Sequence, residues 1–270
     1  MEIQEKKELI NWASLKNTNV YIHQKKILSN ININLSYGEN TLILGPNGSG
    51  KSTFLKLLNR SIYPIKGKNS SIKLFNKENI NIWELRKKIG FLFKEMEERV
   101  NYGVNLYDVI TSGFSGTFNS RCSKLISEGE KIKIDNLINQ WELNNIIYTK
   151  FKDLSDGQKR RALIARALVY EPDILVLDEP FSNLDIKSTF ILNRNLNKMI
   201  DQSINILYVT HNLESILAKT NRVILIKEGK ILKDGSPNEL LNSNTISDLF
   251  DISINVIEHQ GSWRIDQLRN

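Results

Sequence analysis

A glycine-rich stretch at residues 45–53 carries the residue types that bind phosphate. It matches the pattern GxxxxGK(S/T), and its glycines let the backbone curl so that successive N–H groups point at one anion. Lys51 can reach the β- and γ-phosphates of a nucleotide, and the Ser52 hydroxyl can ligate Mg²⁺. The residues of the predicted phosphate loop are Gly45, Pro46, Asn47, Gly48, Ser49, Gly50, Lys51, Ser52 and Thr53.

Two adjacent carboxylates, Asp178 and Glu179, follow the continuous apolar run of residues 174–177. Such a run is typical of a parallel strand covered on both faces, and ligands bind at the carboxyl ends of such strands. This setting favours a metal site over a simple helix cap: Asp178 can hold Mg²⁺, and Glu179 can orient and deprotonate an attacking water. His211 follows another apolar run, residues 204–209, and it can hydrogen-bond a γ-phosphate.

A third motif, residues 153–161, opens a predicted helix. Ser155 is a good N-cap, Gly157 allows close approach to the backbone, and the helix dipole favours an anion. By itself this motif indicates either an ordinary helix cap or an anion site.

Tyr21 precedes the phosphate loop, within an antiparallel entry predicted over residues 9–37. An aromatic ring here can stack on adenine. A tyrosine packed in the core or in a hairpin explains the residue equally well, so both roles stay open.

The remaining pattern supplies the elements that position these residues. Short apolar strands are predicted at residues 41–44, 71–75, 89–93, 222–227 and 231–235. Between residues 95 and 160 the pattern changes to amphipathic helices with few β-branched runs. The sequence therefore predicts an α/β chain with an antiparallel entry and a helical insert.

Composition excludes several classes of protein. The 270 residues are 40% hydrophobic and 25% charged, and no apolar run approaches the roughly 20 residues that cross a bilayer. The amino terminus lacks a signal peptide, and Cys122 is the only cysteine, so we expect a cytoplasmic protein without a disulfide or a cysteine metal site. The net charge of +7 is spread without a long basic run, and we do not expect a nucleic-acid partner.

With these motifs in this order, the chain resembles the ATP-binding cassette (ABC) ATPases over roughly residues 9–260. The matching motifs are the Walker A loop GPNGSGKST (45–53), the signature LSDGQ (154–158), Walker B ILVLDEP (174–180), the D-loop SNLD (182–185) and the switch histidine His211. The signature is the discriminating motif, because other P-loop NTPases lack it. The resemblance implies ATP hydrolysis with ATP and Mg²⁺ bound.

The resemblance also implies an architecture. We expect the fold class α/β, a P-loop NTPase with a RecA-like core, an antiparallel β-subdomain and a helical insert. A single ATPase domain would cover residues 9–250. Within it, the core and β-subdomain would occupy about 9–93 and 165–240, and the helical subdomain about 95–160, with a C-terminal tail at 251–270.

Cassettes of this family pair head to tail, which implies a homodimer or a pair with a paralogous cassette. Each ATP would then lie between the Walker loop of one chain and Ser155, Gly157 and Gln158 of the other. Asp185 of the D-loop would belong to the same nucleotide site.

Two positions depart from the family pattern. Asp156 stands where the commonest signature has its second glycine, and we expect little effect there. After the strand ending at Phe93 the family usually has a glutamine whose carbonyl oxygen contacts Mg²⁺ and whose loop meets the membrane partner. Lys94 stands here instead, and a lysine cannot ligate a cation. Either the loop has another role or Glu97 substitutes, and our hypothesis is that Glu97 faces the metal.

The stretches at 82–90, 98–100 and 112–114 narrow the resemblance to soluble single-cassette ATPases related to the molybdenum-transport-associated branch. The first functional hypothesis is therefore the ATPase subunit of a transporter, peripheral on the cytoplasmic face of a separate transmembrane permease. The alternative is a soluble ABC ATPase that acts on nucleic acid, ribosomes or cofactor assembly.

Overall fold

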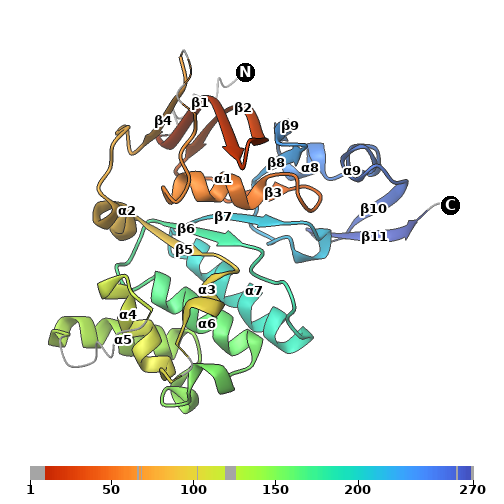
Figure 1. Ribbon diagram of the computed structural model, residues 1–270. Coiled ribbons are helices and arrows are strands. Elements are labelled where there is room, and N and C mark those ends of the chain that lie inside the picture. Colours follow the sequence, from red (N-terminus) through yellow and green to blue (C-terminus); the bar gives the residue numbers. More distant parts are fainter. Residues whose placement is uncertain are drawn as a thin grey trace, which may run out of the picture.

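A six-stranded sheet forms the centre of the protein in the computed structural model, which describes residues 10–65, 67, 69–101, 103–118, 126–259 and 261–268 (Figure 1). Its strand order is β5-β6-β7-β3-β8-β9, with β9 antiparallel to β8 and the other pairs parallel. The strands are β3 (Thr41–Leu44), β5 (Ile89–Leu92), β6 (Ile174–Asp178), β7 (Asn205–Thr210), β8 (Arg222–Lys227) and β9 (Lys230–Gly235). The carboxyl ends of β5, β6, β7 and β3 therefore lie side by side at one edge.

The antiparallel sheet predicted at the start of the chain is present, in the order β2-β1-β4. Its strands are β1 (Asn11–Ile22), β2 (Lys25–Ser36) and β4 (Ser71–Leu74). Helix α1 (Lys51–Leu58) lies between this sheet and the central one (Figure 1), and its apolar residues share a buried cluster with both. Strand β3 separates two cores, because Ile43 faces this cluster whereas Leu42 and Leu44 face the other.

Helices cover the opposite face of the central sheet, and they include the predicted helical insert (Figure 1). The helical elements here are α3 (Met96–Arg99), α4 (Leu106–Ser115), α5 (Glu128–Gln140), η2 (Asn144–Ile146), η3 (Phe151–Asp153), α6 (Asp156–Ala167) and α7 (Ile186–Asp201). Helix α2 (Ile82–Lys88) precedes β5, and its buried Leu85 belongs to the cluster shared with the antiparallel sheet. Helix α6 crosses the expected limit of the helical part near residue 160 and continues to Ala167. The α/β fold class is confirmed.

The carboxyl-terminal part of the chain forms regular helices and strands, where a tail was expected. After η4 (Leu213–Ser215) and the last sheet strands come α8 (Pro237–Leu240), α9 (Ser243–Phe250), β10 (Ile254–His259) and β11 (Ser262–Leu268). Strands β10 and β11 form an antiparallel hairpin within the expected tail, 251–270. Ile254 and Trp263 are buried in the main core, which explains why this segment folds back.

Among the described residues, no helix has the length and apolar character needed to cross a bilayer. Cys122 and the first nine residues lie outside the described part of the chain.

Candidate active site

The phosphate loop follows β3 and depends on glycine for its path. Gly48 and Gly50 have φ angles of 77° and 103°, in the left-handed region that side chains rarely adopt. At Gly45 a Cβ atom would lie 2.1 Å from the Ile226 carbonyl oxygen. Helix α1 begins at Lys51, so the free N–H groups of its first turn open towards the loop.

Lys51 and Ser49 give the loop its polar lining. The buried Lys51 Nζ donates hydrogen bonds to the carbonyl oxygens of Gly45 and Pro46, at 2.8 and 2.9 Å. Burial lowers the pKa of Lys51, and the nearby Glu179 and Asp178 oppose this shift. The Ser49 Oγ is buried and has no hydrogen-bond partner among the described residues. An orphaned hydroxyl and a buried ammonium in one glycine-rich loop fit a phosphate group.

Ser52 and Asp178 bring two metal-type oxygens together. The Ser52 Oγ donates a hydrogen bond of 3.0 Å to Asp178 Oδ1 at the end of β6. Burial raises the pKa of Asp178, the Ser52 hydrogen bond opposes this shift, and Glu179 adds to it. A nearby cation would stabilise the charged form of this buried carboxylate, and a hydroxyl oxygen lies next to it. Oxygen ligands of these two kinds fit Mg²⁺.

Glu179 and His211 form the second pair of the site. The Glu179 Oε1 lies 2.8 Å from His211 Nδ1, and Glu179 has a φ angle of 47°. Both residues follow the ends of neighbouring strands, β6 and β7. The carboxylate is thus held by an imidazole at the place where it can accept a proton from a water molecule.

These pairs line one cavity of about 680 Å³. Its wall includes Asn47, Ser52, Asp178, Glu179, His211 and Lys94. The cavity is open to solvent beside the loop and presents carboxylate, hydroxyl and ammonium groups together. It can therefore hold a phosphate chain, a cation and an attacking water.

The signature residues and Asp185 do not line this cavity, whereas Ser182, Asn183 and Leu184 of the D-loop do. Ser155 is exposed and caps α6 together with Gln158, in a reciprocal capping box. Gly157 is buried against α7, where a Cβ would lie 2.2 Å from Ser188 Oγ. Asp185 caps α7 through the Ser188 N–H at 2.7 Å. Within the chain, Gly157 is therefore needed for packing against Ser188, a reason that the sequence pattern did not reveal.

Tyr21 lies near the end of β1 and 42% of its surface is exposed. The Lys26 Nζ lies 5.8 Å from the centre of its ring. The adjoining pair of this hairpin is Val20 with Leu28, and a Cβ on Gly50 would lie 2.7 Å from Leu28 Cδ2. The hairpin that carries Tyr21 thus packs directly against the phosphate loop.

The hypothesis that Glu97 faces the metal is wrong. Glu97 lies on the one-turn helix α3, and its Oε1 is 3.3 Å from Nη2 of the buried Arg160 on α6. Glu97 does not line the cavity, whereas Lys94 does. No site role was predicted for Lys94, although its position directly after a strand that ends beside the phosphate loop is a signal for one. Glu95 pairs with Lys56 of α1 at 2.9 Å and with Arg99 of α3 at 3.5 Å.

A phosphate loop that faces a carboxylate–histidine pair across the ends of parallel strands is the site of a P-loop ATPase. The family model described as ABC transporter matches residues 28–182, more than half of the chain. The chain belongs to this family of ATP-binding cassettes. Its finer placement near the molybdenum-transport-associated branch stays a prediction.

Curated relatives and a solved structure agree with this family. The chain is 34% identical over 222 residues to the spermidine/putrescine import ATP-binding protein PotA of Borrelia garinii, covering 80% of this chain and 60% of that protein. It is 30% identical to the uncharacterized ABC transporter ATP-binding protein YmeB of Lactococcus lactis, covering 90% of this chain and 93% of YmeB. It also matches the cassette MJ0796, a dimer in a post-hydrolysis state with ADP and phosphate, with 26% identity, a TM-score of 0.68, and coverage of 83% of this chain and 98% of that one.

Proposed function

We propose that this protein binds and hydrolyses ATP to power a separate membrane-spanning partner. The observation that carries the proposal is the pairing of Glu179 with His211 across the cavity from the phosphate loop. The family and the import role in the name of PotA support transport. The protein would act in the cytoplasm, at the membrane face on which its partner presents a docking segment.

The chemistry follows from the residues that line the cavity. The phosphate loop holds the phosphate chain, and Lys51 contacts its β- and γ-phosphates. Ser52 and Asp178 would hold Mg²⁺, which neutralises charge on the phosphate oxygens. Glu179 orients the attacking water and accepts its proton, while His211 keeps the carboxylate in place. The products are ADP and phosphate.

The active unit is a head-to-tail pair of chains. Ser155 and Gln158 do not line the cavity of their own chain, and Ser155 is exposed at the start of α6. A second chain would present this helix start, with its free N–H groups, to the bound phosphates. The dimeric form of the similar cassette MJ0796 supports this arrangement. ATP binding would close the pair, and hydrolysis would reopen it.

Tyr21 would stack on the adenine ring. Its exposed ring stands on the hairpin that packs against Gly50 of the phosphate loop. A base that extends away from the loop would meet this face, and stacking tolerates any purine.

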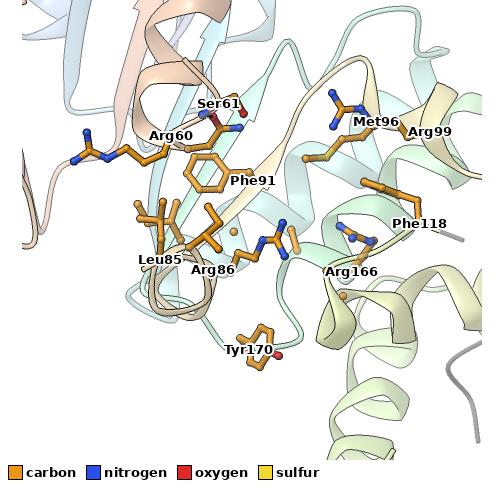
Figure 2. Close-up of a pocket in the computed structure, with 17 residues that line it drawn as sticks. Arg60, Ser61, Leu85, Arg86, Phe91, Met96, Arg99, Phe118, Arg166 and Tyr170 are labelled. Carbon is orange, nitrogen blue, oxygen red and sulfur yellow. Dashed lines mark hydrogen bonds between the residues drawn. The ribbon is translucent and has the colours of Figure 1, made fainter. Parts of the chain in front are cut away.

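A cleft of about 350 Å³ between α2, β5, α4 and α6 is the proposed docking place for the membrane partner (Figure 2). It borders the loop after β5, and it combines apolar residues such as Phe91 with several arginines. Arg86 reaches towards Arg166, and Arg86 has no ion-pair partner among the described residues. Burial, with Arg86 nearby, lowers the pKa of Arg166 to about 10. An amphipathic segment with a carboxylate would complement this cleft.

The test is a pull-down of tagged Glu179→Gln protein with ATP from solubilised cells, followed by mass spectrometry. We expect a multi-spanning membrane protein to be recovered. Lys51→Ala is a control that should not bind nucleotide. Arg86→Glu is a second control, in which the charge of one cleft residue is reversed. Both should lose the partner. Recovery of ribosomal or nucleic-acid-bound proteins without a membrane protein would contradict the transport proposal.

A further inference from the structure

Lys94 lies in the wall of the catalytic cavity and has no partner among the residues that the structure describes. It follows the end of β5 and lines the same cavity as Ser52, Asp178 and Glu179. Its side chain is exposed, and no hydrogen bond or ion pair involves its ammonium group in the described part of the chain. Two neighbouring acids are committed elsewhere, because Glu95 pairs with Lys56 and Glu97 with Arg160.

The order of the strands fixes the side from which Lys94 approaches. Strands β5, β6, β7 and β3 are neighbours, and their carboxyl ends carry Lys94, the two carboxylates, His211 and the phosphate loop in that order. The end of a phosphate chain held by the loop would lie against the carboxylates and His211. Lys94 borders the same space from the opposite side, on a flexible four-carbon stem.

The charges that line the cavity indicate what the Lys94 ammonium group can bind. The carboxylates of Asp178 and Glu179 lie close to the place where the phosphate oxygens must bind. Like charges repel, so these carboxylates disfavour phosphate binding. Lys51 is buried in the loop and already donates to two of its carbonyl oxygens. Lys94 is therefore the cavity's uncommitted lysine on the side of the carboxylates. The third phosphate of ATP adds negative charge at that end, whereas ADP does not reach it.

We propose that Lys94 binds the terminal phosphate of ATP directly and makes the site discriminate ATP from ADP. The residue would act as a specificity-determining contact with the substrate, in place of the carbonyl ligand to Mg²⁺ expected from the family pattern. Because this contact is between an ammonium and a phosphate, it does not require a metal ion. The inference rests on ATP binding by the cassette and not on the identity of a membrane partner.

The experiment measures nucleotide affinity rather than turnover. Isothermal titration calorimetry with ATP and with ADP, both in excess EDTA, removes metal and hydrolysis together. Lys94→Gln should weaken ATP binding about tenfold, the usual size of one charge-assisted hydrogen bond, and change ADP binding less than twofold. Lys94→Arg should retain most of the preference for ATP, because it keeps the charge.

Lys73→Gln is the matched control, since Lys73 is an exposed lysine on β4 outside the cavity. It should leave both affinities unchanged. Equal weakening of ATP and ADP binding by Lys94→Gln, or no change in either, would overturn the proposal. Circular dichroism of each variant shows whether the chain is folded, and Lys94→Ala, which also removes the charge, must reproduce the loss for ATP alone.

Discussion

Glu97 Oε1 lies 3.3 Å from Arg160 Nη2, and this ion pair joins the one-turn helix after β5 to the helix that follows the signature loop. The Arg160 side chain is only 5% exposed, and its Nε and Nη1 atoms have no hydrogen-bond partner among the described residues. Glu97 is the one acid within ion-pair distance of this cation in the described structure. The segment after β5, which borders the catalytic cavity, is therefore joined to α6 by a buried ion pair.

Removal of this acid should destabilise the fold. Glu97→Gln leaves a buried cation without its counter-charge, and we expect a loss of about 3 kcal/mol in the free energy of unfolding. Glu97→Gln combined with Arg160→Gln should lose less than Glu97→Gln alone, because the uncompensated charge is gone. Urea unfolding measures both, with the exposed Glu98→Gln as control. A double variant less stable than Glu97→Gln alone would show that the charge pair is not the cause.

The contact of Gly157 with Ser188 predicts a packing defect in the signature helix. Gly157→Ala would bring a Cβ to 2.2 Å from Ser188 Oγ and 2.5 Å from Ser188 Cβ, so we expect a loss of about 1–3 kcal/mol. Ser188→Gly should restore more stability to this variant than Ser188→Ala, because alanine keeps the clashing Cβ. Thermal unfolding compares the three. If Gly157→Ala is as stable as the wild type, the predicted clash does not exist in solution.

The buried carboxyl of Asp178 predicts a dependence of stability on pH. Its pKa is raised in the folded protein, so the folded state binds the proton more tightly than the unfolded state. This contribution is present below the ordinary carboxyl pKa of about 3.9 and is lost as the pH rises through the folded pKa.

Asp178→Asn should therefore raise the melting temperature at neutral pH in EDTA, and the gain should shrink as the pH falls through this window. Differential scanning fluorimetry between pH 4.5 and 8 measures it, and the exposed Asp135→Asn is the control. A gain that is independent of pH would rule out the ionised carboxylate as its source.

Glu179→Gln should separate ATP binding from hydrolysis. The amide cannot take the proton of the attacking water, so phosphate release should fall by about 10²–10⁴-fold. ATP binding should persist, and size-exclusion chromatography with ATP should show a stable dimer. Glu128→Gln, an exposed substitution on α5, should have no effect. A fully active Glu179→Gln protein that stays monomeric would refute the mechanism.

Much of the architecture is readable from local pattern. The glycines of the phosphate loop are required by positive φ angles and by a close backbone contact, both local demands on residue type. Ser155 caps the helix that its side chain predicts, and Asp185 caps the following helix, α7. Apolar runs mark the parallel strands, and polar residues directly after them gather at one sheet edge. These features follow from spacing along the chain, because strand ends in a parallel sheet share an edge.

The rest was decided by contacts between residues far apart in sequence. Whether Glu97 faced a metal or a cation depended on how α3 packs on α6, and the spacing of residues 94–98 does not encode that. The same holds for Gly157 against α7 and for the carboxyl-terminal hairpin, where buried Trp263 joins the main core. Sequence by itself determined the family and the phosphate loop, because these reside in contiguous motifs. Only the tertiary structure placed Lys94 in the cavity and Glu97 outside it, because a side chain's partner is set by packing in three dimensions.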